Sequence, residues 1–451
     1  MIRWLLIIIA VAGIALATVF VFDSYVLRLT TIIAAICLCL WLSEIVPPFV
    51  PTFLLFALIP LLLGPFDKKF SLPSVLNWSM DPVIALFFGG FVLGVAAEAH
   101  GFDKRLANIA LRLAGRSYTG FLLLIILLTA FLSMWMSNIA AAVLMLACLH
   151  PVLLNFDIDN ILRRCLLVGV ALGANIGGIS TPVGTGPNAI AIASISETTH
   201  ISFLGWMGFA LPLSLGMLAV GFALLWFRIR GQKDEWTSRA CQLNNKSSCG
   251  KDLKIGKQGE YAFLLVFAGT ILLWSTEALH GVSASVVSLC SASILFLTRL
   301  LKKEHLFCVD WSTLLLIAGG ITLGKLLEQS GLITTLAANV AWSEYNTTFA
   351  LLLLCLASAM LSALMSNTAT AVMLIPLAVM IVPGPSTAIL VAIAASFGMP
   401  FVISTPPNAM VFGKGGVKFG DLFWPGLLIM ILGCALISLT GKQLLNLAGI
   451  P

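Results

Sequence analysis

The chain has 451 residues, of which 60% are hydrophobic and 10% charged, and its formal net charge is +6. Its mean hydropathy of +1.06 exceeds what a water-soluble fold of this size could bury, so the lipid bilayer must be its solvent and a soluble or nucleic-acid-binding domain is excluded. Ten cysteines lie mostly in apolar segments without a CxxC pair or a Cys/His cluster, which argues against a zinc or haem site and leaves no organic cofactor to expect.

Apolar stretches of roughly 20 residues, the length that crosses about 30 Å of hydrocarbon, recur along the whole chain and predict about 11 transmembrane helices. These stretches are 4–22, 29–46, 51–64, 82–100, 164–196, 203–227, 258–279, 282–300, 311–329, 386–410 and 422–447. The first has no clear small-residue cleavage site and precedes many more spans, so we predict a retained helix rather than a signal peptide. The fold class is therefore an all-α polytopic membrane protein.

Two further apolar stretches carry a polar Ser-Asn pair in the middle, where a helix that faces lipid stays apolar. The stretches are 119–150 and 347–383, and the pairs are Ser137-Asn138 and Ser366-Asn367. We predict that both are re-entrant hairpins whose tips meet inside the protein.

The distribution of lysine and arginine predicts the orientation of the chain. With a cytoplasmic N-terminus, the cytoplasmic side receives Arg3, Lys104, Arg105, Arg112, Arg116, Arg163, Arg164, the 228–257 stretch, Arg299, Lys302, Lys303, Lys414 and Lys418. The outer side receives Arg28, Lys68, Lys69 and Lys442, while Lys325 falls within a span. This positive-inside pattern predicts an integral plasma (inner) membrane protein with its C-terminus on the outer side.

The 228–257 stretch carries eight basic and three acidic residues and separates two halves of the chain, 1–227 and 258–451. We interpret it as a solvated cytoplasmic linker, with contact to acidic lipids as the alternative.

Three short patterns occur once in each half, in the same order. The first pattern is Phe88-Gly89-Gly90-Phe91-Val92-Leu93-Gly94, which corresponds to Ala318-Gly319-Gly320-Ile321-Thr322-Leu323-Gly324. The second is Ser137-Asn138-Ile139-Ala140, which corresponds to Ser366-Asn367-Thr368-Ala369. The third runs from Thr181-Pro182 through Pro187-Asn188-Ala189 and corresponds to Thr405-Pro406-Pro407-Asn408-Ala409. The predicted topology places the two hairpins on opposite sides of the membrane, so the halves are inverted repeats. Secondary transporters use such repeats to place a substrate site near the bilayer midplane.

The repeated residues predict binding sites for ions of both signs. Each Ser-Asn tip begins a half-helix whose free N–H groups carry partial positive charge, which favours an anion. The Thr-Pro and Pro-Asn pairs break the spans 164–196 and 386–410, because proline removes a donor and disfavours helix in the residue before it. The freed carbonyls, with Ser and Asn oxygens, are hard ligands suited to Na⁺. Such residues also serve close packing in membrane helices, but their recurrence in both halves favours a site.

At this point the residues resemble the divalent anion:sodium symporter family, the carriers of dicarboxylates, citrate or sulfate, over nearly the whole chain. In that family a Ser-Asn-Thr motif at each hairpin tip binds substrate and sodium, a role that falls here on Ser137, Asn138 and Ile139 and on Ser366, Asn367 and Thr368. The resemblance further assigns Na⁺ to Ser133, Ser362, Gly184, Thr185 and Ser404, and substrate to Thr181, Pro182, Thr405 and Pro406. It also implies an elevator-type transporter that forms a homodimer.

The first motif departs from the family pattern, because Ile139 replaces a hydroxyl residue with a branched apolar one. Substrate is then held mainly by the second motif, or one end of it makes a less polar contact. Three substrates are consistent with this departure, namely sulfate, a C4-dicarboxylate and a tricarboxylate. Of these we favour a C4-dicarboxylate such as succinate, malate or fumarate, taken up together with Na⁺. Neither repeated motif contains an arginine, so backbone dipoles and hydroxyls would recognise the anion.

Ionisable residues near the spans are further candidates, because charge inside a membrane is costly and usually functional. Two roles are consistent with the sequence for the first group, a structural ion pair or a part in coupling ion transport to substrate transport; the group is Glu44, Glu98, Lys325 and Glu328. We expect the histidines to lie at the membrane interface; they are His100, His150, His200 and His280.

Three other functions compete with the symporter. A channel needs a continuous polar pore, whereas these polar groups cluster at two tips. An enzyme needs a base beside its nucleophile, which the Ser-Asn pairs lack in sequence, so we predict no catalytic activity. An anion exchanger that does not use Na⁺ stays open, because the sodium ligands are partly backbone.

Overall fold

The computed structural model describes residues 2–43, 45–101, 117–230, 257–332, 334–335 and 346–450. Within these ranges every regular element is helical, which confirms the predicted all-α class. The first half contains α1 (Ile2–Val21), α2 (Tyr25–Ser43), α3 (Val50–Leu62), α4 (Leu72–Ser79), α5 (Pro82–Ala99), α7 (Tyr118–Ser133), α8 (Asn138–Leu153), α9 (Ile161–Gly177), α10 (Gly186–Ile195) and α11 (Phe203–Ile229). The second half contains α13 (Lys257–Ser275), α14 (Glu277–His280), α15 (Ala284–Leu297), α16 (Trp311–Gln329), α18 (Thr347–Leu364), α19 (Asn367–Ile381), α20 (Pro385–Ser396), α21 (Pro406–Gly413) and α22 (Phe419–Leu447).

Six of the described helices are long and apolar enough to cross a membrane, namely α5, α9 with its continuation to Ser180, α11, α16, α18 and α22. Other described helices contribute shorter apolar stretches of 10–17 residues. Both predicted hairpins are present, as α7–α8 and α18–α19, and both predicted breaks are present, between α9 and α10 and between α20 and α21. Most of the predicted linker, and Glu44, lie outside the described residues.

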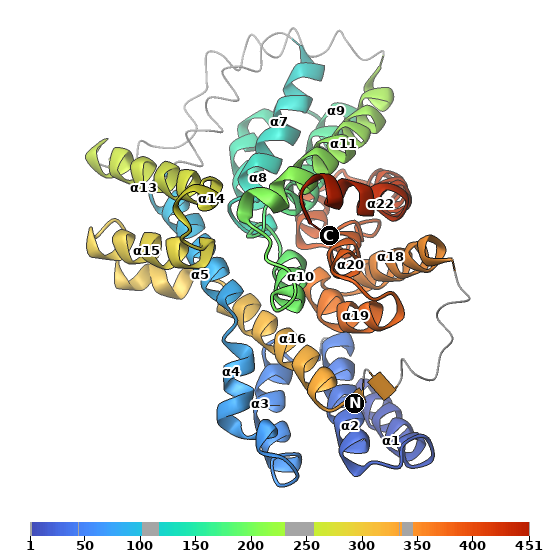
Figure 1. The fold of residues 1–451 in the computed structure, drawn as a ribbon. Coiled ribbons are helices and arrows are strands. Elements are labelled where there is room, and N and C mark those ends of the chain that lie inside the picture. Colours follow the sequence, from blue (N-terminus) through green and yellow to red (C-terminus); the bar gives the residue numbers. More distant parts are fainter. Residues whose placement is uncertain are drawn as a thin grey trace.

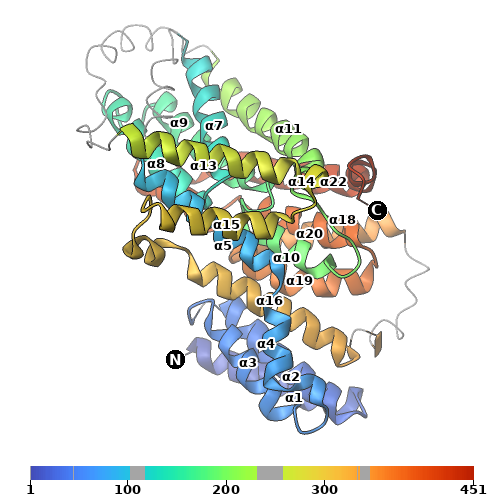
Figure 2. The ribbon, with the colours of Figure 1, turned by 60° about the vertical axis from the view of Figure 1, so that its left-hand side comes forward.

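The helices form two bodies. One, the hairpin body, consists of α7–α11 and α18–α22, and the other, the flanking body, consists of α1–α5 and α13–α16 (Figures 1 and 2). Helix α16 runs along the boundary and packs on α10 and α19 of the hairpin body. Each body takes helices from both halves of the chain, so neither half forms a unit by itself.

Some of the repeated glycines of α5 and α16 lie at this boundary, whereas Gly89 and Gly319 face Ser288 and Thr52 within the flanking body. A Cβ added at Gly90 would crowd Val183, which lies in the first break, and a Cβ added at Gly320 would overlap Val372 of α19. These two glycines are counterparts in the repeat, and both allow the hairpin body to approach the flanking helices closely. Gly90 and Gly320 therefore each provide a close contact between the two bodies.

The two halves exchange helices inside the hairpin body. Helix α10 of the first half packs against α16, α19 and α20 of the second, while α21 of the second half packs against α8 and α9 of the first. The second part of each broken helix therefore lies among helices of the opposite half.

The connection between α10 and α11 (residues 196–202) makes polar contacts to the flanking body. The contacts are Ser196 Oγ to Asp81 Oδ2 (3.1 Å), Glu197 to Lys325, and His200 Nε2 to Glu277 Oε1 (3.6 Å). Asp81, Lys325 and Glu277 come from three different flanking segments, so one short connection of the hairpin body is tied to the flanking body at three places.

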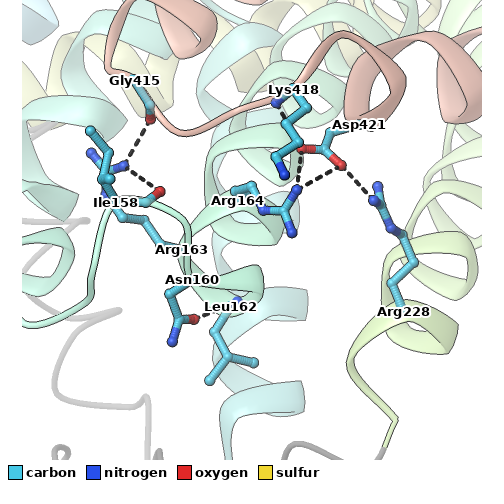
Figure 3. A network of polar contacts seen from close by, with 9 residues as sticks. All are labelled: Ile158, Asn160, Leu162, Arg163, Arg164, Arg228, Gly415, Lys418 and Asp421. Atoms are coloured by element: carbon cyan, nitrogen blue, oxygen red, sulfur yellow. Dashed lines mark hydrogen bonds and ion pairs between the residues drawn. The ribbon is translucent and has the colours of Figure 1, made fainter.

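A buried carboxylate joins the two halves at the opposite end of the hairpin body. Asp421, in the first turn of α22, pairs with Arg164 of α9 and Arg228 of α11, and its Oδ2 accepts a hydrogen bond from Lys418 N at 2.8 Å (Figure 3). The Asp421 side chain is 3% exposed, compared with 14% for Arg164 and 35% for Arg228. A charge this deeply buried is tolerated only when it is paired and hydrogen-bonded, and Asp421 meets both conditions.

The neighbouring Arg163 holds the connection between α21 and α22. Its Nη1 donates to Gly415 O at 2.8 Å (Figure 3). Its Nη2 donates to Lys414 O at 2.9 Å. Gly416 follows with a φ of +83°, a conformation that other residues rarely adopt. Together, these contacts tie the second broken helix to the start of α9.

We expect Asp421→Ala to lower the thermal unfolding midpoint of the detergent-purified protein by several degrees. The substitution leaves two arginines without their partner, and removing one member of a buried pair costs about 3–5 kcal/mol, less here because Arg228 is partly exposed. Asp67→Ala is the control, because Asp67 and its partner Lys69 are each about half exposed and an exposed ion pair contributes little to stability. Equal midpoints for the two variants would contradict the assigned role.

Candidate functional site

The first hairpin tip gathers several oxygens around Asn138. Ser137 caps α8 by accepting a hydrogen bond from Ala140 N at 3.2 Å. Ser133 Oγ lies 2.8 Å from Asn138 Oδ1 and 2.6 Å from Ala174 O, both of which are acceptors. A hydroxyl has a single hydrogen and can donate to only one of them at a time. Three oxygens this close with one hydrogen between them form an electron-rich cluster that suits a hard cation.

The first break lies beside this cluster. A Cβ added at Gly178, at the start of the 3₁₀ turn after α9, would overlap Asn138 Oδ1 and Gly184 O. The side-chain oxygen of the tip and the carbonyl oxygen of the break therefore face the same small space. Both Gly178 and Gly184 are buried.

The second tip repeats this arrangement with different residues. Ser366 caps α19 by accepting from Ala369 N at 3.1 Å, and Ser362 Oγ donates to Asn367 Oδ1 at 2.7 Å. Ser404, in the second break, donates to Ala363 O at 2.8 Å and accepts from Phe401 N at 3.0 Å. Each half thus places a Ser–Asn pair beside a broken helix, as the sequence predicted.

One asparagine amide in each half closes the break. Asn188 Nδ2 in α10 lies 2.8 Å from Thr181 O, 3.1 Å from Gly178 O and 3.3 Å from Ile179 O. Asn408 Nδ2 in α21 lies 3.0 Å from Met399 O and 2.9 Å from Phe401 O. Both asparagines are essentially inaccessible to solvent. These carbonyls have no backbone N–H partner within the helix, because the helix ends there. The asparagine amide supplies the missing hydrogen-bond donors.

The two asparagines correct the register of the third repeated pattern. They are 220 residues apart, and at this offset the counterpart of Thr405, the N-cap of α21, is Thr185, the N-cap of α10. The match of Thr181 to Thr405 made from sequence is therefore displaced by four residues. Thr181 is buried and donates to Met134 O at 2.5 Å, beside the first tip.

Contacts between the halves complete the arrangement. Asn175 Nδ2 of α9 donates to Asn408 Oδ1 at 3.1 Å, in a fully buried position. Thr368 of the second tip lies directly against Gly186, the first residue of α10, where any Cβ would overlap the threonine Oγ1. Tips and breaks of both halves therefore form one continuous assembly.

The predicted site residues are all brought to these two tips and two breaks. The structure buries Ser133, Thr181, Pro182, Gly184, Ser362, Ser404 and Thr405, leaves Ser137, Asn138, Thr185, Asn367 and Thr368 partly exposed, and exposes Ile139, Ser366 and Pro406. The exposed and partly exposed groups are the tip residues and the first residues of the half-helices. A ligand can therefore reach the tips, while the serine–carbonyl contacts lie beneath them.

The ionisable candidates lie away from the tips. Lys325 pairs with Glu197 and Glu328, Glu98 is exposed at the end of α5, and the described histidines lie at or near helix ends. Among the residues that the structure describes, no three His, Cys, Asp or Glu side chains gather at one place. The described side chains of the assembly contribute neutral oxygens, and the helix N-termini beside them carry partial positive charge.

Sequence reasoning missed Asn175, Asn188 and Asn408 as structural donors, and it missed the contact of Gly186 with Thr368. The Pro-Asn pair recurs in both halves and was the available signal for the two break asparagines. Nothing in the sequence pairs Asn175 with Asn408.

Comparison with known proteins identifies the family to which this helical protein belongs. The family model of the citrate transporters matches residues 38–389, and the chain belongs to this family. It is a member of a class of integral membrane transporters that includes sodium-dependent dicarboxylate carriers.

The names of individual relatives state different substrates, or none. An uncharacterized transporter of Haemophilus influenzae is 31% identical, covering 89% of this chain and 88% of its own. The inorganic phosphate transporter PHO87 of Saccharomyces cerevisiae is 30% identical over 82% of this chain and 41% of its own. The sodium-dependent dicarboxylate transporter SdcS of Staphylococcus saprophyticus is 26% identical over 87% of this chain and 82% of its own.

The crystal structure of the Alcanivorax borkumensis YdaH transporter, described as having an unusual topology, is similar in fold. Its TM-score is 0.53 at 14% identity, covering 88% of this chain and 99% of that one.

We expect Asn188→Asp to lower the thermal unfolding midpoint and to abolish transport. Aspartate keeps the shape but removes the two Nδ2 hydrogens, which are shared among three buried carbonyls, at about 0.5–1.5 kcal/mol for each hydrogen bond lost. It also places a carboxylate oxygen against these carbonyl oxygens, which adds to the loss of stability. Asn346→Asp is the matched control, because Asn346 caps α18 at an exposed end by accepting two hydrogen bonds through Oδ1, which aspartate retains. A stable, active Asn188→Asp protein would show that the amide is not needed to hold the break.

Proposed function

We propose that this protein is a secondary active transporter that couples Na⁺ entry to the uptake of a small divalent anion. The observation that carries the proposal is the crowding of Ser133 Oγ, Asn138 Oδ1 and Ala174 O within hydrogen-bond distance around one hydrogen, repeated in part by Ser362 and Asn367. Family membership and the sodium-dependent relative support the choice of Na⁺.

The proposed cation sites consist of neutral oxygens. The first would use Ser133, Ser137, Asn138, Gly184 and Thr185, and the second Ser362, Ser366, Asn367 and Ser404. Neutral hydroxyl, amide and carbonyl oxygens suit a monovalent hard cation, whereas divalent ions usually require carboxylates. Na⁺ bound there would reduce the repulsion between these oxygens and hold each tip against its break, which prepares the half-helices for the anion.

The proposed anion site lies between the tips and faces the N-termini of α8, α19, α10 and α21, whose N–H groups carry partial positive charge. The substrate residues would be Ser137, Asn138, Ile139, Ser366, Asn367, Thr368, Thr405 and Pro406, with Thr181 and Pro182 behind the first break. Two substrate classes are supported by relatives, a dicarboxylate through SdcS and inorganic phosphate through PHO87.

We further propose that the hairpin body moves as an elevator against the flanking body in a homodimer. The two bodies approach each other closely at Gly90 and Gly320, and one connection of the hairpin body carries the three polar contacts described above. These contacts would have to break and re-form in each transport cycle.

Removing a serine ligand should raise the Na⁺ concentration that gives half-maximal uptake. We expect about a tenfold rise for Ser133→Ala and for Ser362→Ala in proteoliposomes, because a hydrogen bond or ligand contact to a charged group contributes about 1.5–3 kcal/mol. Ser288→Ala is the matched control, since Ser288 is an equally buried serine in α15 that bonds only to its own helix, at Ala284 O.

The same uptake assay separates the proposal from its closest rival. Replacement of external Na⁺ by choline should reduce uptake to background. Equal rates in the two media would exclude sodium coupling and favour an exchanger of the same architecture.

A further inference from the structure

The two places where a hairpin tip meets the opposite broken helix differ in chemistry. We call them corners. The first corner joins Thr368 of the second tip to Gly186 of α10, and their contact is direct. The second corner is its counterpart in the repeat, where α21 packs on α8 and the corresponding residues are Ile139 and Pro406.

The assignment of the second corner follows from the observed register. Thr185 and Thr405 are the N-caps of α10 and α21, so the first helical residues Gly186 and Pro406 correspond. Both tip serines cap their half-helices in the same way, so Ile139 and Thr368 are each the second residue of the helix that follows.

The first corner offers donors for an anion. Thr368 contributes a hydroxyl, and Gly186 contributes a backbone N–H at the first position of a helix, where it has no partner within the helix. No described side chain caps α10, whereas Ser137, Ser366 and Thr405 each cap the half-helix that they precede. The absence of a Cβ at Gly186 lets the Thr368 side chain lie directly against the start of α10.

The second corner lacks both kinds of donor. Proline has no N–H, so Pro406 removes the donor that Gly186 supplies. Ile139 has no hydroxyl and is 46% exposed, and the nearby Ile403, in the second break, is 77% exposed. An anionic group placed there would find neither the side-chain hydroxyl nor the first-position N–H that the first corner offers, which is less favourable.

We infer that the site selects a compact tetrahedral oxyanion, such as phosphate or sulfate, over an extended dicarboxylate. This inference rests on the proposed function and specifies its substrate class. A tetrahedral oxyanion concentrates its charge in one group, which the Thr368–Gly186 corner can bind. A C4-dicarboxylate carries a carboxylate at each end, and its second end would face the apolar Ile139–Pro406 corner.

Parallel uptake of ³²P-phosphate, ³⁵S-sulfate and ¹⁴C-succinate into proteoliposomes under a Na⁺ gradient tests the inference. We expect a half-saturating concentration at least tenfold lower for phosphate or for sulfate than for succinate, and the two labels distinguish which oxyanion is carried. Succinate binding as tightly as the better oxyanion, or more tightly, overturns the inference but leaves the proposed function in place. Absence of Na⁺-dependent uptake of all three overturns both.

Variants at the corners test the structural reason. Thr368→Val should weaken oxyanion affinity about tenfold to a hundredfold at saturating Na⁺. Ile139→Thr should shift the ratio of succinate to oxyanion affinity towards succinate by about tenfold, because it adds a donor at the second corner. Ile139→Val adds no donor and should shift the ratio much less than Ile139→Thr does.

Size-exclusion profiles and thermal midpoints confirm that each variant is folded before its affinity is compared. If Ile139→Val changes the ratio as much as Ile139→Thr, or if folded Thr368→Val binds oxyanion as the wild type does, the corners do not determine selectivity. Should Thr368→Val fail to fold, Thr368→Ser, which keeps the hydroxyl, and Thr368→Ala, which removes it, replace the comparison.

Discussion

The rest of the site depends on the two asparagine amides that replace the hydrogen bonds lost at the broken helices. A break in a membrane helix exposes carbonyls and N–H groups that lipid cannot satisfy, so it persists only where protein supplies partners. Asn188 and Asn408 satisfy the carbonyl side of each break from within the following half-helix. The N–H side is then free to face the centre of the protein. The same two residues that stabilise the breaks thus create the conditions for binding anions there.

The absence of formal charge at the described tips distinguishes this design from sites that bind anions through arginine. Charged residues of the hairpin body are instead found at its ends, as in the pairing of Asp421 with Arg164 and Arg228. A site of neutral dipoles has no fixed counter-charge for an anion. Binding of one Na⁺ there would therefore change the local charge by one full unit. This is the physical reason that coupling between cation and anion is expected here.

Much of this organisation could be predicted from the sequence because the relevant signals are local. Ser137-Asn138 and Ser366-Asn367 interrupt apolar stretches, and the Pro-Asn pairs interrupt two spans, so hairpins and breaks were predicted near their observed bounds. Contacts between the halves could not be predicted, because a single amino-acid sequence does not show which residues far apart in the chain lie in contact. Asn175 with Asn408 is the clearest example. The register of the break also needed the structure, because Thr-Pro occurs at a different distance from Asn188 than from Asn408.

The exchange of α10 and α21 between the halves has a consequence for biosynthesis. A ribosome completes α10 well before α16, α19 and α20, against which α10 packs, have been made. Until then Gly186 lacks its contact with Thr368, and α10 is too short to span a bilayer alone, at about 15 Å for its 10 residues. The first half therefore cannot reach its final structure during its own translation, and maturation must wait until the second half has entered the membrane.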